Sequence, residues 1–163
     1  MSGRLIPGML FALLASVGVC QAPLQPVRVC EVLADLAAHE GKVTAIVGRF
    51  SFREDGRFLS EEACGRPNAL RIVFDPKAAP PLPQGLEFDA AAVYRNLKLI
   101  RRGTALGKFR FGSVEYDRWA VIYGRVEAGA KTTVTRKTSF EPSPAQVLCR
   151  GESAILFLPD AEQ

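Results

Sequence analysis

Two strand-like runs with a glycine-arginine pair near their centre constrain the fold of this chain most strongly. The first run covers residues 42–52 and contains Gly48-Arg49, and the second covers residues 116–126 and contains Gly124-Arg125. An interior glycine weakens a strand unless the chain must bend or coil sharply there, as at the corner of a closed barrel. Two such strands in 163 residues therefore favour a small β-barrel.

Apolar spacing and capping residues predict two helices. Apolar residues recur at helical spacing over 30–40, and Gly41 follows where a helix C-cap is expected. A second helix is expected to begin after the cap residue Asp89 and to end at Gly103.

The remaining strands follow from turn residues and β-branched or aromatic runs. The Asp55-Gly56 pair predicts a hairpin turn leading to a strand at 57–60, and the run ALRIVF predicts a strand at 69–74. Later strands are expected at 132–136 and 154–158. The proline-containing stretch SFEPSPAQ between them is expected to be a loop.

This order of elements indicates the fold class. Three strands, a helix and two closing strands form the layout of the oligonucleotide/oligosaccharide-binding (OB) barrel. We therefore expect a mainly β fold with two helices: a small OB-like β-barrel of five to six strands, one helix before strand 1 and one between strands 3 and 4. The alternative is an α+β sandwich with both helices on one side of an open sheet.

The N-terminal segment has the layout of a secretory signal peptide. Arg4 precedes an apolar run at 9–19, which is too short to span a bilayer as a helix. We expect a signal peptide at 1–22 and one domain at 23–163, periplasmic or extracellular after cleavage and without a transmembrane span. Lipid anchoring at Cys20 is the less favoured alternative, because a bulky β-branched residue precedes it.

Export would place the cysteines in an oxidising compartment, where disulfides persist. We expect a bridge between Cys30, which opens the first helix, and Cys64, which closes the first hairpin. The competing pair is Cys64 with Cys149. No metal site is expected, because the cysteine and histidine spacings lack zinc-binding motifs and His39 is the only histidine.

Basic and aromatic residues alternate along the first three strands, the surface that OB barrels use for stacking and backbone neutralisation. The candidate ligand-binding residues are Arg49, Phe50, Phe52, Arg57, Phe58 and Arg71, with Phe109 and Arg110 from a second cluster. The opposing interpretation places the phenylalanines in the core and the arginines on a solvated face. Without Arg4, 20 basic residues face 17 acidic ones, a mild excess that permits an anionic partner.

The sequence contains no recognisable catalytic constellation, phosphate loop or dinucleotide fingerprint. His39 is expected to interact with a helix C-terminus, and Glu61-Glu62 to form a solvated rim. A thiol-dependent redox protein using Cys149 is an alternative that requires an accessible thiol of lowered pKa. We expect a non-enzymatic module without a cofactor.

Three runs carry a resemblance to a known group: VRVCEVL at 27–33, HEGKVTAIVGRF at 39–50 and LSEEACG at 59–65. They resemble small exported bacterial proteins with an OB-like barrel, and are more distantly similar to tRNA-anticodon-binding-like OB domains. The resemblance implies a fold and an envelope location. The expected function is binding or interaction in the bacterial cell envelope, with an envelope protein or an anionic glycan as partner; nucleic-acid binding is the alternative.

Overall fold

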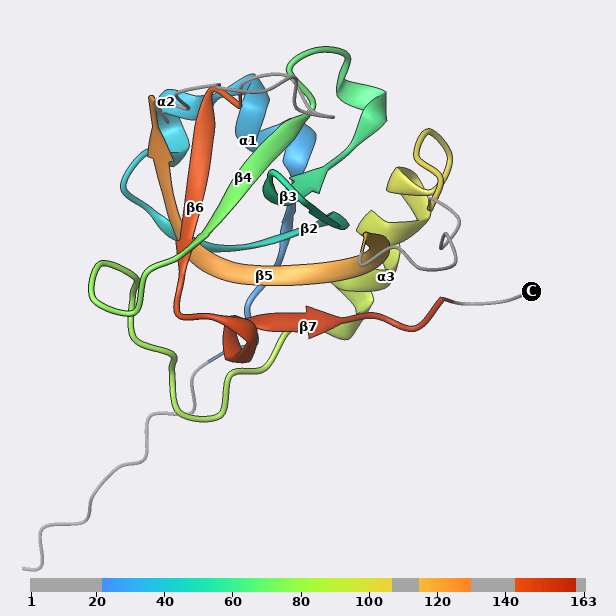
Figure 1. Ribbon diagram of the computed structural model, residues 1–163. Coiled ribbons are helices and arrows are strands. Elements are labelled where there is room, and N and C mark those ends of the chain that lie inside the picture. The colour runs from blue at the N-terminus through green and yellow to red at the C-terminus, as the bar shows by residue number, and fades with distance from the viewer. Residues whose placement is uncertain (1–21, 107–114, 130–142, 161–163) are drawn as a thin grey trace, which may run out of the picture.

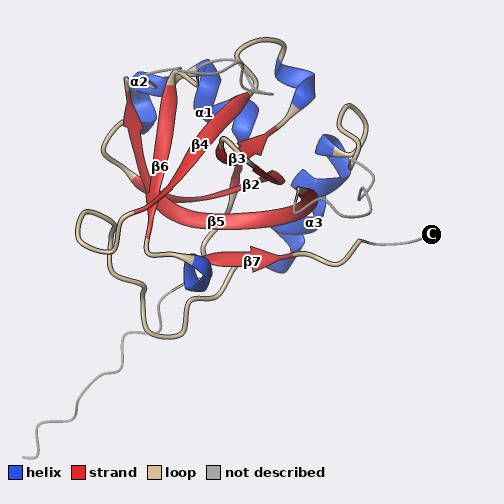
Figure 2. Ribbon diagram, viewed as in Figure 1, coloured by secondary structure: helices blue, strands red, loops and turns tan. Residues whose placement is uncertain are grey.

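The computed structural model describes residues 22–106, 115–129 and 143–160 (Figure 1). Within these residues a strongly curved sheet forms the body of the domain, and helices cover its end and side (Figure 2). Among the described helices, none is long and apolar enough to cross a membrane.

Five strands close into the barrel. They are β2 (Val43–Arg53), β3 (Gly56–Ser60), β4 (Ala69–Phe74), β5 (Tyr116–Ala128) and β6 (Ala145–Cys149). They follow the order β2-β3-β4-β6-β5, and β5 returns to pair with β2, from Val43 opposite Arg125 to Phe52 opposite Tyr116. The β4–β6 pair is parallel and the other four pairs are antiparallel. This closure confirms the predicted small OB-like barrel and excludes the open sandwich.

Two short strands extend the sheet beyond the barrel. β1 (Val27–Arg28) pairs in parallel with β2, and β7 (Ile155–Phe157) pairs antiparallel with β5. The strand expected at 154–158 is therefore present, although it lies outside the closed ring as an edge strand.

The last barrel strand differs from expectation. Residues 145 and 146 belong to β6, whereas the sequence pattern placed them in a loop. The reason is alternation: Ala145, Val147 and Cys149 are fully buried in the barrel core, a period-2 pattern that the neighbouring prolines obscured. The strand expected at 132–136 lies outside the described residues.

The first predicted helix is two short helices, α1 (Val29–Ala34) and α2 (Leu36–His39). Asp35 interrupts them with a non-helical backbone, and its side chain accepts a hydrogen bond from the Ala38 N–H at 3.0 Å. Helix α1 buries Val29 and Val32 in the barrel core. Both helices therefore lie at one end of the barrel (Figure 2).

The second predicted helix is α3 (Ala90–Ile100), and Asp89 caps it by accepting a hydrogen bond from the Ala92 N–H at 3.0 Å. Its buried face packs on the outer side of β2 and β5, where Val93 and Leu97 join Trp119 in a second, smaller core. Helix α3 thus covers the side of the barrel, whereas α1 and α2 lie at one end.

Both strand-interior glycines lie at close approaches of the backbone. A Cβ at Gly48 would lie 2.9 Å from a Val29 methyl carbon, and one at Gly124 would lie 2.5 Å from the Leu148 carbonyl oxygen. Side chains at these positions would force the strands apart. The predicted role of the two glycines in a tightly coiled barrel is consistent with this geometry.

The predicted disulfide between Cys30 and Cys64 is present and joins the start of α1 to the 3-10 helix η1 (Glu62–Cys64). The second short 3-10 helix, η2, covers Glu152–Ala154. Cys149 is free and buried, so the competing pair does not form.

Candidate functional site

The predicted aromatic residues separate into buried and partly exposed positions. Phe50 is 2% exposed and belongs to the barrel core, and Phe58 is 4% exposed. For these two side chains the structure supports the core interpretation. Phe52 is only partly buried and packs against the edge of that core.

The predicted arginines also separate. Arg49 forms an ion pair with Glu62 and donates a hydrogen bond to the Ala105 carbonyl oxygen at 2.7 Å, so it links β2 to η1 and to the segment after α3. Arg71 is half-buried on β4, opposite Phe58 on β3. Phe109 and Arg110 lie outside the described residues.

Three aromatic rings and one arginine side chain stack on one another at the end of the barrel away from α1. We call Phe52, Arg57, Phe74 and Tyr116 the rim cluster. The Arg57 guanidinium carbon lies 4.3 Å from the centroid of the Phe74 ring and 5.2 Å from that of Phe52. The Phe52 ring in turn stacks on Tyr116, with centroids 5.5 Å apart and planes 11° apart. All four side chains are partly exposed.

Strand register brings the rim cluster together. Phe52 on β2 lies directly opposite Arg57 on β3 and opposite Tyr116 on β5. Arg57 also lies opposite Ile72, and Phe74 follows two residues later on the same face of β4. Side chains opposite or diagonal on one face of a sheet are in reach of one another. The cluster therefore depends on barrel closure, since it draws on four sequence regions.

The stack continues toward β7. The Phe157 ring lies 5.6 Å from that of Phe50 in an edge-to-face arrangement, and the exposed Arg118 guanidinium lies 4.3 Å from the Phe157 centroid. Sequence reasoning missed Phe74, Tyr116, Arg118 and Phe157. Each lies at or near the end of a predicted strand, and the barrel register was needed to show that these ends meet.

Arg57 differs from several arginines nearby in its partners. Arg28, Arg49 and Arg53 form ion pairs with Glu61, Glu62 and Asp117. The Arg57 side chain forms no hydrogen bond or ion pair within the part of the chain that the structure describes, and its guanidinium packs on the two ring faces. Its guanidinium N–H groups are therefore free of protein acceptors there, which suits recognition of an oxygen-rich anion.

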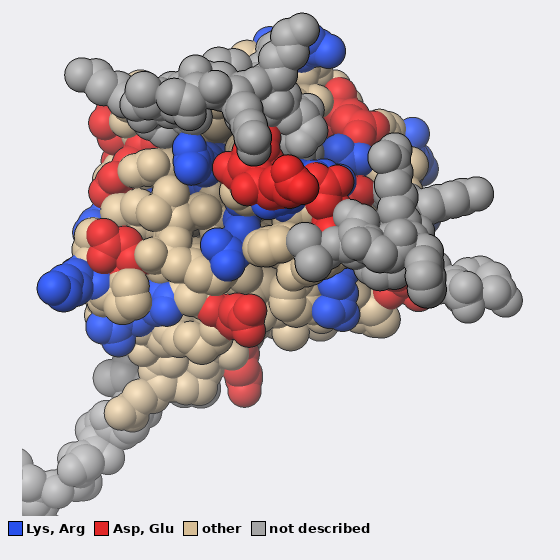
Figure 3. All heavy atoms as spheres, in the orientation of Figure 1, with Lys and Arg blue, Asp and Glu red and all other residues tan. Residues whose placement is uncertain are grey.

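On the face drawn in Figure 3, basic and acidic side chains are interspersed. Nonspecific binding of nucleic acid depends on a basic surface that neutralises many phosphates. The described surface in this view therefore offers local recognition by single cations, with limited long-range attraction of a polyanion.

Cys149 is unsuited to thiol chemistry in this fold. It is fully buried, and burial raises the pKa of its thiol, while a hydrogen bond with the Gly151 backbone and the charge of Arg57 lower that pKa to a smaller extent. The redox alternative needs an accessible thiol with a net lowered pKa. In the structure the Cys149 thiol is buried and its pKa is raised.

The expected solvated rim at Glu61-Glu62 is wrong for Glu61. This side chain is fully buried, accepts a hydrogen bond from the Cys30 N–H at 3.1 Å and pairs with Arg28 at 3.2 Å. Only Glu62 is exposed. The cause is the disulfide and α1, which bring the N-terminus of α1 against the end of β3.

Glu61, Cys30 and Cys64 are the one group of three potential metal ligands found among the described residues. The two sulfurs are bonded to each other, so neither is a thiolate ligand in this state. The group therefore serves to join the start of α1 to η1.

Comparison of the chain with protein-family models, with curated proteins and with solved structures finds no match. Functional inference therefore rests on the geometry of the site.

Proposed function

We propose that this chain is an exported, non-enzymatic OB-like binding module of the bacterial cell envelope, and that its rim cluster binds an anionic glycan. The observation that carries the proposal is the position of Arg57, a guanidinium held between the faces of Phe52 and Phe74 with no carboxylate of the described residues paired to it. An envelope protein that presents a carboxylate to the same cluster is the second candidate.

The chemistry of the rim cluster matches an acidic sugar. An arginine fork donates paired, charge-assisted hydrogen bonds to a carboxylate or sulfate. The partly exposed rings beside it supply apolar contact area for the less polar face of a pyranose. Arg57 and Phe74 lie on β3 and β4, the second and third barrel strands, and OB folds bind oligonucleotides and oligosaccharides at these strands.

Two features support export. The segment at 1–22 has signal-peptide character, and the domain carries a disulfide of a kind that persists in oxidising compartments. A buried Cys149 thiol supports a non-enzymatic role, because it removes the one nucleophile considered from the sequence.

The decisive experiment compares Arg57→Ala with Arg95→Ala. Both remove one positive charge, and Arg95 is exposed on α3, away from the rim cluster. The probe is a short galacturonic acid oligomer, with the neutral galactose oligomer as reference, in isothermal titration calorimetry. Arg57→Ala is expected to weaken binding of the acidic oligomer by about ten- to a hundredfold, since charge-assisted hydrogen bonds contribute about 1.5 to 3 kcal/mol. Equal weakening by both variants would overturn the site.

Single-stranded oligothymidine in the same assay tests the nucleic-acid alternative. Tight binding that falls steeply with added salt and depends on Arg57 would favour that alternative over the glycan.

A further inference from the structure

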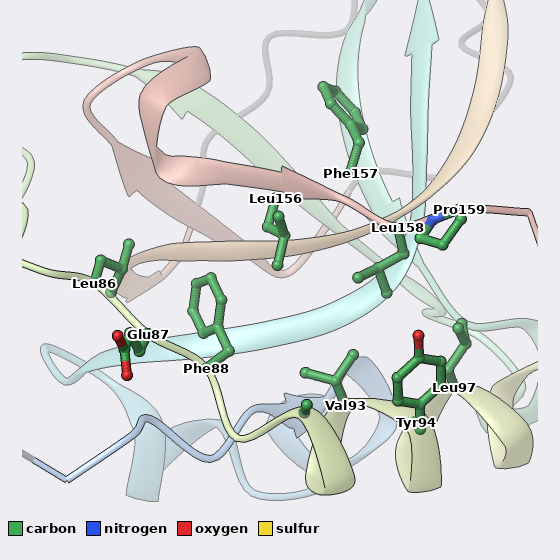
Figure 4. A pocket seen from close by; sticks show the side chains of 11 residues that line it. Leu86, Glu87, Phe88, Val93, Tyr94, Leu97, Leu156, Phe157, Leu158 and Pro159 are labelled. Atoms are coloured by element: carbon green, nitrogen blue, oxygen red, sulfur yellow. The ribbon is translucent and has the colours of Figure 1, made fainter.

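A second concave surface lies on the other side of β7 from the rim cluster. It is an apolar slot of about 450 Å³ between α3, the segment at 86–88 and the C-terminal segment at 156–159 (Figure 4). This volume lies in the range of ligand-binding pockets, and such pockets are mainly apolar. We call it the α3–β7 slot.

Apolar side chains form the walls of the slot, together with the backbone of one strand. In Figure 4, Leu156 and Leu158 point from the C-terminal segment toward α3, whereas Phe157 points to the opposite side. Phe157 therefore lines the slot through its main chain. At the rim, Tyr94 is 61% exposed and Leu156 is 44% exposed, so apolar surface here remains in water.

The backbone of β7 has an unpaired edge. The Leu158 N–H donates to the Trp119 carbonyl oxygen at 2.8 Å, and Leu156 lies opposite Val121 on β5. Because backbone groups alternate sides along a strand, those of Ile155 and Phe157 face away from β5. Among the described strands, β5 is the only neighbour of β7. An edge of this kind is a template for another strand.

Charge distinguishes one end of the slot. Glu87 is exposed and is the only charged residue among those that line it. It has no ion-pair partner within the described part of the chain. A ligand with a cation at this end would therefore be favoured, and one with an anion disfavoured.

We propose that the α3–β7 slot binds an extended apolar peptide segment of another protein, which pairs with the free edge of β7 and places a lysine or arginine beside Glu87. Main-chain hydrogen bonds to Ile155 and Phe157 would supply strand addition, and alternate side chains would enter the slot. This surface is separate from the rim cluster, so the module would hold a partner protein and its own ligand at the same time.

Two fluorescent peptides of alternating leucine and threonine, one with a terminal lysine and one with a terminal glutamate, test the proposal with the full chain in fluorescence anisotropy. The lysine peptide is expected to bind about fivefold more tightly, and Glu87→Lys is expected to reverse this preference. A lysine peptide N-methylated at alternate positions is expected to lose binding, because methylation removes the N–H groups that strand pairing requires.

Leu156→Asp and Leu99→Asp form a matched pair of variants. Leu156 lines the slot, whereas Leu99 is similarly exposed at 42% on α3 but does not line it. Leu156→Asp is expected to abolish peptide binding, and Leu99→Asp is expected to leave it unchanged. Circular dichroism of both variants is the control for folding.

Four outcomes would overturn the proposal. Failure of both peptides to bind is the first, and equal effects of the two aspartate variants are the second. If the protein forms dimers and Leu156→Asp dissociates them, a second copy of this chain occupies the slot. Peptide binding that appears only after removal of residues 1–21 would assign it to the N-terminal segment, which enters the described domain beside the slot through the pairing of Leu24 with Phe88.

Discussion

The Arg57 guanidinium lies between the rings of Phe74 and Phe52, at 4.3 Å and 5.2 Å from their centroids. These three residues come from three adjacent barrel strands, so the contact ties the rim of β2 to the rim of β4 across β3. The two rings hold the Arg57 guanidinium in place, although none of the described residues forms an ion pair with it. The arrangement serves stability as well as recognition.

Arg57→Ala is expected to reduce the free energy of unfolding by about 1 to 2 kcal/mol, because each cation–π contact contributes about 0.5 to 1 kcal/mol or more when partly desolvated. Arg57→Lys is expected to recover part of the loss, since an ammonium keeps the charge but not the planar stacking. Urea denaturation of each variant measures both. Stability of Arg57→Ala equal to that of the native protein would show that the stack contributes nothing.

Glu61 and Glu62 are adjacent but are expected to respond differently to the same substitution. Glu61→Gln weakens an ion pair between the fully buried Glu61 and the partly buried Arg28, together with a hydrogen bond from the Cys30 N–H, so we expect a loss of about 2 to 3 kcal/mol. Glu62→Gln weakens a half-exposed pair with Arg49, and its cost is expected to stay below about 1 kcal/mol. Thermal denaturation separates them, and equal shifts would contradict the assigned burial.

The bridge between Cys30 and Cys64 closes a separation of 34 residues. Replacing both cysteines with serine is expected to destabilise the domain by about 4 kcal/mol on the loop-entropy account. Guanidinium denaturation with and without a reducing agent provides the measurement. The reducing agent is expected to destabilise the native protein and to leave the double variant unaffected; an equal effect on both would assign the loss to something other than this bond.

Cys149 is expected to make stability fall at alkaline pH. Burial raises its folded-state pKa above the unfolded value, so the unfolded chain releases the thiol proton first as pH rises. The native protein then binds more protons than the unfolded chain, and the free energy of unfolding falls from the unfolded pKa upward through the folded one.

Urea midpoints from about pH 7 to about pH 10 test this dependence. Cys149→Ala is expected to lack this component of the alkaline loss, while the part from Tyr123, whose pKa burial also raises, remains. Identical pH profiles for the native protein and Cys149→Ala would contradict the assignment.

Gly124→Ala is expected to cost more than Gly85→Ala. The new methyl group at 124 would lie 2.5 Å from the Leu148 carbonyl oxygen, which forces β5 and β6 apart. At Gly85 the φ angle is 68° but the space is open, so the cost is expected to be about 1 kcal/mol of backbone strain. Hydrogen exchange of β6 amides would reveal the separation, and unchanged protection there would contradict it.

Local sequence patterns predicted much of the fold. Residues 69–74 form the strand that ALRIVF indicated, and Asp89 caps α3 as its position suggested. The turn at Asp55-Gly56 joins β2 and β3. These features depend on neighbours within a few residues, and alternation, turn chemistry and capping encode them directly.

The candidate site was only partly predictable. Phe52 and Arg57 were identified from basic-aromatic alternation, whereas Phe50 and Phe58 shared that pattern and proved to be buried. A phenylalanine in a barrel strand satisfies the same local rule whether it points into the core or lies at its rim. Depth along the barrel separates Phe50 from Phe52, which share one face of β2, whereas Phe58 lies on the face of β3 opposite to Arg57. No local pattern records depth.

The sequence alone favoured the barrel over the open sandwich and the Cys30–Cys64 pair over Cys64–Cys149, and it identified the two glycines that permit close strands, because each of these inferences depends on residue type and order along the chain. The structure settled the first two by closing the ring and by forming the bond. Only the tertiary structure decided that β6 closes the ring, that Glu61 is buried beside the disulfide, and that Phe52, Arg57, Phe74 and Tyr116 meet. Each of these depends on register between distant strands. Burial of the common core sets that register, and a one-residue slip would turn every rim side chain to the other face.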